Sequence, residues 1–134
     1  MDQPHRPVAM AIVDEVGMLM AYQQMDRLRV FTRRHAIRKA YTAAVTGMNS
    51  GAFGEDCVKV RGFSVREIGG DLELTPGAGG VVVRASRHAP QNPEEAHINV
   101  MGGIGVGGYL TGREDEELAM IGLRAMGLVP PTAP

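Results

Sequence analysis

A run of alternating glycines near the C-terminus constrains this chain more than any other feature. Residues 100–108 read Val-Met-Gly-Gly-Ile-Gly-Val-Gly-Gly, and residues 111–117 follow with the charges typical of a helix start. Successive residues of a strand point to opposite faces, so Gly103, Gly105 and Gly107 leave one face without side chains. The intervening isoleucine and valine point to the other face. A helix backbone, a second subunit or the edge of a flat ligand can therefore come close to the bare face.

The same run also matches the G-x-G-x-x-G pattern of dinucleotide-binding turns. That fold requires the motif in its first strand–helix turn, followed by a parallel strand with an acidic residue about 20 residues later. Here the motif lies near the C-terminus, and no strand pattern follows it. The next helix begins with Glu114, Asp115, Glu116 and Glu117, whose carboxylates would repel a bound phosphate. We therefore expect neither NAD nor FAD.

Charge and cysteine content exclude several classes of protein. The 134 residues include 14 basic and 15 acidic residues, which gives no electrostatic reason to expect nucleic acid or an anionic membrane as a partner. No apolar run approaches the roughly 18 to 20 residues of a membrane helix, and the first seven residues lack the order of a signal peptide. The single Cys57 excludes an internal disulfide and a four-cysteine zinc site. We expect one cytoplasmic domain over residues 1–134, with loose ends at 1–7 and 129–134.

The first half of the sequence predicts a hairpin and a helix. The apolar run 8–13 should form a strand covered on both faces, and Gly17 provides the positive φ of a turn before a second strand at 18–24. Apolar residues spaced by three and four predict a helix over 33–48, with Thr32 as its N-cap and Gly47 near its end. Residues 50–75 carry a weaker signal, compatible with a short strand or a short helix.

The second half predicts strands and a final helix. A turn at 76–80 precedes a β-branched strand at 81–84, a polar loop at 86–95, and the glycine strand, which should open at residue 97. Thr111 and Glu114 form a capping box for the last helix. The apolar face expected for that helix consists of Leu118, Ile121, Gly122, Ala125 and Met126. Hairpins with a late helix favour an antiparallel sheet with segregated helices, hence the α+β class.

Five motifs, taken in order, resemble a known family. They are V-A-M-A-I-V-D-E-V-G at 8–17, Y-Q-Q-M-D at 22–26, R-K-A-Y-T-A at 38–43, T-P-G-A-G-G-V at 75–81, and G-I-G-V-G-G at 103–108 with Asp115 after it. The set is similar to the signatures of the GlcG/HbpS-like haem-binding domains, which also supply the C-terminal domain of PduO-type corrinoid adenosyltransferases. In this resemblance Asp14, Gly17, Asp26 and Asp115 are the motif residues of structural importance; Asp14 and Asp26 are expected to cap turn amides.

The resemblance implies a profilin-like fold with α/β/α layers, assembly into homo-oligomers, and binding of haem or a related tetrapyrrole in some members. Three features depart from the family pattern. Members usually carry an amphipathic helix before the first strand, whereas seven residues precede Val8 here. Gly107 stands where the family usually has serine. The loop 86–95 is longer than expected.

Several side chains are candidate ligand contacts. Lys39 and Thr42 lie three residues apart on the first helix and can face one way, towards a propionate or a substrate carboxylate; alternatively, Lys39 is solvated and Thr42 packs on the sheet. His35 is a candidate iron ligand or general base. His88 and His97 share that candidacy, and for all three a surface position is the simpler interpretation. Tyr109 could supply a phenol, as could Tyr41, which is better explained as core. No metal-ligand spacing is present, so no protein-bound metal ion is expected.

These residues lead to three hypotheses. The first is a small-ligand binding protein, using a pocket between the first helix and the glycine strand (Gly103, Gly105, Gly107) at an oligomer interface, and haem is the ligand that the resemblance implies. The second is an enzyme or enzyme subunit acting on a small carboxylate or aromatic metabolite through Lys39, Thr42 and one histidine. The third is an assembly partner without a pocket.

Overall fold

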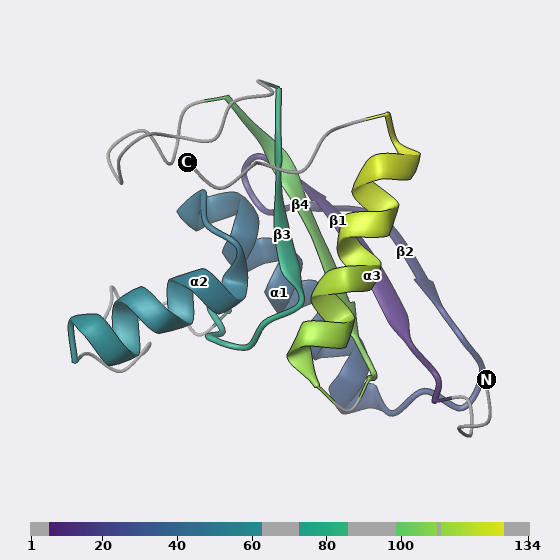
Figure 1. Cartoon of the computed structure of the whole chain (residues 1–134). Helices are drawn as coiled ribbons and strands as arrows, with labels where there is room; N and C mark the ends of the chain where they lie inside the picture. Colours follow the sequence, from purple (N-terminus) through teal and green to yellow (C-terminus); the bar gives the residue numbers. More distant parts are fainter. Residues whose placement is uncertain (1–5, 63–72, 86–98, 110, 128–134) are drawn as a thin grey trace.

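The computed structural model describes residues 6–62, 73–85, 99–109 and 111–127 (Figure 1). The expectations for the loop 86–95, for a glycine strand opening at residue 97, for the tail 129–134 and for residues 1–5 lie outside this part of the chain. The described elements are β1 (Ala9–Asp14), β2 (Leu19–Gln24), α1 (Val30–Thr46), α2 (Ser50–Gly54), the π-helix η1 (Glu55–Val60), β3 (Gly80–Arg84), β4 (Val100–Gly107) and α3 (Gly112–Ala125).

The four strands form one antiparallel sheet in the order β2-β1-β4-β3. β4 is central, and its Gly105 pairs with Ala11 of β1 on one side and with Gly80 of β3 on the other. α1 covers one face of the sheet and α3 the other (Figure 1). The α+β class and the α/β/α layering are therefore confirmed.

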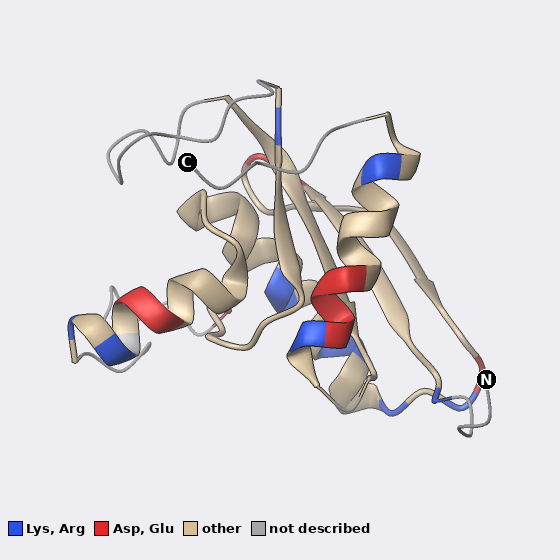
Figure 2. Ribbon diagram, in the orientation of Figure 1, with Lys and Arg blue, Asp and Glu red and all other residues tan. Residues whose placement is uncertain are grey.

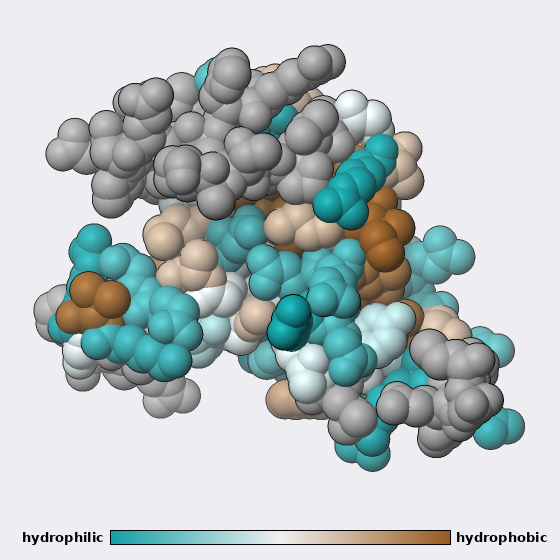
Figure 3. Space-filling view, in the orientation of Figure 1, coloured by the Kyte–Doolittle hydropathy of each residue, from teal (hydrophilic) through white to brown (hydrophobic). Residues whose placement is uncertain are grey.

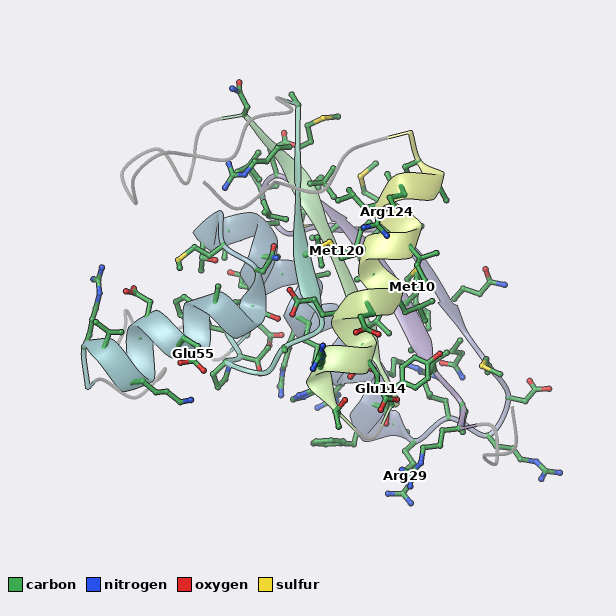
Figure 4. All side chains as sticks on the ribbon, viewed as in Figure 1. Met10, Arg29, Glu55, Glu114, Met120 and Arg124 are labelled. Atoms are coloured by element: carbon green, nitrogen blue, oxygen red, sulfur yellow. The ribbon has the colours of Figure 1, made fainter. Side chains whose placement is uncertain are left out.

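Two hydrophobic cores fill the space between these layers. On the α1 side Ala11 and Val13 pack against Ala40 and Ala44. On the α3 side valines of β3, with Ile104 and Val106 of β4, pack against Ala119 and Leu123. Burial along β1 alternates, because its even-numbered residues Met10 and Ile12 are only partly covered on the α3 side. Met10 of β1 and Met120 of α3, labelled in Figure 4, both pack against the α3-side core.

α1 starts three residues before its predicted first residue, Arg33. Its N-cap is Arg29, which makes no side-chain capping bond, and Thr32 lies inside the first turn, so the expectation of a Thr32 cap was wrong. The first turn was missed because Val30 and Phe31 face outward, ahead of the inward-facing alanine row. The predicted end is confirmed, since Gly47 adopts a left-handed conformation with φ 69°.

α3 begins as predicted but turns a different face inward. The Oγ1 of Thr111 accepts a hydrogen bond from the backbone N–H of Glu114 at 3.2 Å, the first half of the capping box. The buried residues are Asp115, Ala119 and Leu123, whereas Ile121 is 57% exposed and Met126 and Ala125 are also exposed. The prediction therefore placed the buried face of α3 on the wrong side of the helix, because the buried face includes the carboxylate of Asp115.

The weak stretch after α1 is helical. Residues 50–60 form the short helix α2 and the π-helix η1, so the short-helix alternative is correct for this part, while residues 63–72 lie outside the described chain. The hairpin turn is also as predicted, with Gly17 at φ 83°. Among the described helices, none is long and apolar enough to span a bilayer.

Candidate functional site

The bare face of β4 is covered by α1. A Cβ placed on Gly105 would lie 2.0 Å from the carbonyl oxygen of Ala36, and one on Gly103 would lie 2.2 Å from that of Ala40. Gly107 is less tightly covered, its Cβ position lying 3.2 Å from the Thr32 carbonyl oxygen. The sequence left a helix, a subunit and a flat ligand open as occupants of this face. The helix backbone occupies it, and no space remains between α1 and β4 for the pocket expected there.

Lys39 extends from this helix into a buried ion pair. Its Nζ lies 2.9 Å from Oδ2 of Asp115 and donates to the carbonyl oxygen of Val106 at 3.0 Å. The two side chains are only 5% and 4% exposed. The other carboxylate oxygen, Oδ1, accepts the backbone N–H of Tyr109 at 3.0 Å. The interpretation of Lys39 as a solvated side chain was therefore wrong; its ammonium joins α1 to the start of α3.

Thr42 holds the loop that leads into β3. Its hydroxyl donates to the carbonyl oxygen of Arg38 at 2.8 Å and accepts the backbone N–H of Thr75 at 2.9 Å. The Ser50 hydroxyl does the same for the next turn, donating to the Gly77 carbonyl oxygen and accepting from the Gly80 N–H. The loop Thr75–Gly80 is thus fixed against α1 by the buried Thr42 and against α2 by the buried Ser50.

His35 lies one helical turn before Lys39, beside this loop. Its Nε2 lies 3.5 Å from where a Cβ on Gly77 would be. Its ring stacks on Phe31, with centroids 5.2 Å apart and planes inclined by 21°. Burial lowers the pKa of His35 below 6.5, and the positive charges of Lys39 and Arg38 lower it further, while Asp115 opposes them. The imidazole is therefore held neutral and half-buried under an aromatic ring that is 72% exposed.

The other candidates are spread over the fold. Oδ1 of Asp14 accepts the backbone N–H groups of Val16 and Met18 within the hairpin turn, and Asp26 is exposed beyond β2. Tyr109 presents its backbone to Asp115 and packs its ring against the α3-side core. His88 and His97 lie outside the described residues. Within the described ranges, no three His, Cys, Asp or Glu side chains come together as a metal site.

Sequence reasoning missed Phe31 and Ser50. Phe31 precedes His35 by four residues, a spacing that places two rings on one side of a helix, so a longer predicted helix would have paired them. Ser50 gave no such signal, because its partners Gly77 and Gly80 lie 27 and 30 residues away.

Over residues 1–124 the sequence matches the family described as "Haem degrading protein HbpS-like". The chain belongs to this family. The resemblance inferred from the five motifs is thereby confirmed, and the HbpS-like assignment covers the hairpin, α1, the glycine strand and nearly all of α3. No match to a curated protein was found.

Solved structures share the HbpS-like fold. A double mutant of HbpS from Streptomyces reticuli is 26% identical, with a TM-score of 0.70 over 91% of this chain and 73% of that one. The protein ORFY from Klebsiella pneumoniae is 21% identical, with a TM-score of 0.69 over 92% and 77% of the two chains. A PduOC:heme complex is 20% identical, with a TM-score of 0.69 over 95% and 83%.

The environment of His35 predicts a pH dependence of stability for this HbpS-like protein. The unfolded chain takes up a proton at His35 near pH 6.5, whereas the folded chain resists it to a lower pH. The free energy of unfolding should therefore fall as the pH drops below about 6.5, until the folded-state pKa is passed. Urea unfolding at a series of pH values should show a shallower fall for His35→Gln than for the wild type. Identical slopes would contradict the assigned environment.

Proposed function

We propose that this protein binds haem, or a closely related flat tetrapyrrole, on the outer surface of α1. The residues concerned are Phe31, Arg34, His35 and Arg38, whose spacing of three and four places them on one side of the helix. We call this the Phe31–Arg38 surface. The single observation that carries the proposal is the stacked Phe31–His35 pair, in which a neutral imidazole lies beside an exposed ring.

The side chains of the Phe31–Arg38 surface fit such a ligand in shape and charge. Phe31 offers a flat apolar area. A neutral imidazole nitrogen is the form of histidine that ligates iron. The guanidinium groups of Arg34 and Arg38 suit propionate carboxylates; that of Arg34 is exposed, and that of Arg38 is 3.5 Å from Glu73. When bound, haem supplies an iron centre, and these residues would hold and orient it.

The family to which the chain belongs favours haem as the ligand, and the buried polar contacts behind α1 favour a fixed position for His35. HbpS-like proteins are described as haem degrading, and the PduOC relative was solved with heme. Lys39, Thr42 and Tyr109 act behind the surface: the ion pair of Lys39 with Asp115 and the bonds of Thr42 fix α1 and the Thr75–Gly80 loop around His35. In this proposal Gly103, Gly105 and Gly107 contribute by letting α1 lie close to β4.

Titration of haem into the purified protein tests the proposal. The wild type should give a shifted Soret band, and His35→Ala should bind at least about tenfold more weakly, a loss of about 1.4 kcal/mol. Arg34→Ala combined with Arg38→Ala should weaken binding without removing the iron–nitrogen contribution to the spectrum. His88→Ala is the matched control and should bind as the wild type does. No Soret shift in the wild type, or a loss confined to His88→Ala, would contradict the proposal.

A second function is favoured by the same histidine. A neutral imidazole next to a buried ammonium–carboxylate pair can serve as a general base towards a small carboxylate or aromatic substrate. Two variants distinguish the two functions. If the protein is an enzyme, the Arg34→Ala, Arg38→Ala variant should retain turnover of a neutral substrate, and His35→Gln should lose it. A haem-binding protein would instead show the Soret changes described above.

A further inference from the structure

The outer strand β2 lacks the charged residues and the proline that usually protect a sheet edge, and its one irregularity is a register shift opposite Ile12 and Val13 of β1. Within the described part of the chain, β2 pairs only with β1. Its sequence, Leu-Met-Ala-Tyr-Gln-Gln, contains neither a charged residue nor a proline. Natural edge strands normally use lysine, proline or covering elements to avoid pairing with another chain. An uncharged edge of six residues is therefore a surface suited to strand addition.

The backbone hydrogen-bonding groups of β2 also favour the addition of a strand. The backbone N–H of Met25 donates to the Val8 carbonyl oxygen at 3.0 Å, so Met25 bonds towards β1. In antiparallel pairing, residues alternate between bonding to one neighbour and bonding to the other. The backbone groups of Gln24 and Tyr22 accordingly face outward, away from β1. They form a donor and acceptor row that a further antiparallel strand can continue.

Exposed apolar side chains lie at both ends of this edge. Met18 and Met20 lie at the start of β2, and Met20 is 69% exposed. Met25 and Val30 lie beyond its other end and are also exposed. If the β2 strands of two copies pair antiparallel, Met18 and Met20 of one copy lie beside Met25 and Val30 of the other. Each apolar end of β2 is then covered by the other apolar end of the second copy.

The charges at the two ends are complementary. The β1–β2 turn carries Asp14 and Glu15, while the connection from β2 into α1 carries two arginines, Arg27 and Arg29, against the single Asp26. Figure 2 shows this division, with red at the turn and mainly blue on the connection. Antiparallel pairing of two copies places the acidic end of each against the basic end of the other, whereas parallel pairing would place like charges together.

We infer that β2 is a self-association edge, where two copies of this chain pair antiparallel about a two-fold axis near Ala21–Gln23 to form one continuous eight-stranded sheet. The surface is isologous, because the same strand supplies both sides of the contact. The edge strand Leu19–Gln24 shares no residue with the Phe31–Arg38 surface, and the pairing does not require haem. Both sheets keep their α1 and α3 layers.

Sedimentation of the haem-free protein tests the inference through a lysine placed on the edge. The wild type should sediment as a dimer or an even-numbered assembly, and Met20→Lys should lower the mass at least by half. Val60→Lys is the matched control, since Val60 is 76% exposed at the end of η1, where Figure 3 shows an isolated apolar patch. A monomeric wild type, an unchanged mass for Met20→Lys, or an equal loss for Val60→Lys would overturn the inference.

Charge reversal tests the orientation. The Arg29 side chain extends away from the body of the molecule (Figure 4). Glu15→Arg and Arg29→Glu should each weaken association by about tenfold or more, because each creates two like-charge contacts in a two-fold dimer. The variant carrying both changes should recover most of the wild-type association. Failure of the double variant to recover, with an unchanged circular dichroism spectrum, would rule out antiparallel pairing. Haem titration of Met20→Lys then reports separately on the Phe31–Arg38 surface.

Discussion

An Asp115→Ala variant is expected to lose about 3 to 5 kcal/mol of the free energy of unfolding, because it leaves the Lys39 ammonium buried without its counter-charge. The pair is closed at 2.9 Å, and both side chains are 5% exposed or less. The substitution also removes the acceptor for the backbone N–H of Tyr109. Urea unfolding followed by circular dichroism measures the loss.

Three further variants separate charge from hydrogen bonding. Asp115→Asn retains an amide oxygen for Tyr109 and should lose less than Asp115→Ala. Lys39→Met combined with Asp115→Ala should be more stable than Asp115→Ala alone, because no buried charge remains. Arg113→Ala removes an exposed ion pair with Glu117, 3.6 Å apart, and should change stability by less than about 0.5 kcal/mol. Equal losses for Asp115→Ala and Arg113→Ala would show that the pair is not buried in solution.

A Gly105→Ala variant is expected to lose at least about 3 kcal/mol, at the upper end of the usual cost of overpacking a core. The added Cβ would lie 2.0 Å from the Ala36 carbonyl oxygen and 2.5 Å from the Ala40 backbone nitrogen. Both obstacles are backbone atoms of α1, which cannot rotate aside as a flexible side chain can. The helix has to move away from the sheet, and its alanine contacts are lost along with the close approach. Thermal or urea unfolding measures the effect.

Two other glycines calibrate that result. At Gly107 the nearest atom to an added Cβ is 3.2 Å away, so Gly107→Ala should cost clearly less than Gly105→Ala. At Gly122, on α3, the nearest atoms belong to Met10 at 3.6 Å, and alanine should raise stability by about 0.5 to 1 kcal/mol through helix propensity. A Gly105→Ala variant as stable as Gly107→Ala would show that the α1–β4 contact is looser than described.

Local patterns in the sequence were sufficient for most of the fold. Gly17, the alanine row of α1 and the alternating glycines of β4 each show their role through spacing alone, and the five ordered motifs identified the family. Sequence also named a helix as one possible occupant of the bare strand face. It could not choose between helix and ligand, because the choice depends on which helix packs there and how closely.

The candidate site was less accessible to sequence reasoning. Lys39 and Asp115 are separated by 76 residues, so no local pattern joins them. For the same reason, the inward face of α3 was assigned by hydrophobicity alone and came out rotated, since Asp115 occupies the inward row. His35 was a candidate, but its partner Phe31 lay before the predicted start of the helix. Spacing does not report long-range polar pairing, and the start of α1 was missed because its N-cap, Arg29, makes no side-chain capping bond.

The bond between Lys39 and Asp115 also determines how the molecule opens. If α3 detaches by itself, the buried ammonium of Lys39 loses its carboxylate while remaining under the Thr75–Gly80 loop, which is a costly intermediate. Separation of the C-terminal helix is therefore coupled to separation of α1 from β4. In native-state hydrogen exchange the backbone amides of α3 should not exchange through independent fraying, as terminal helices often do. They should exchange with the same opening free energy as those of α1, as one cooperative unit.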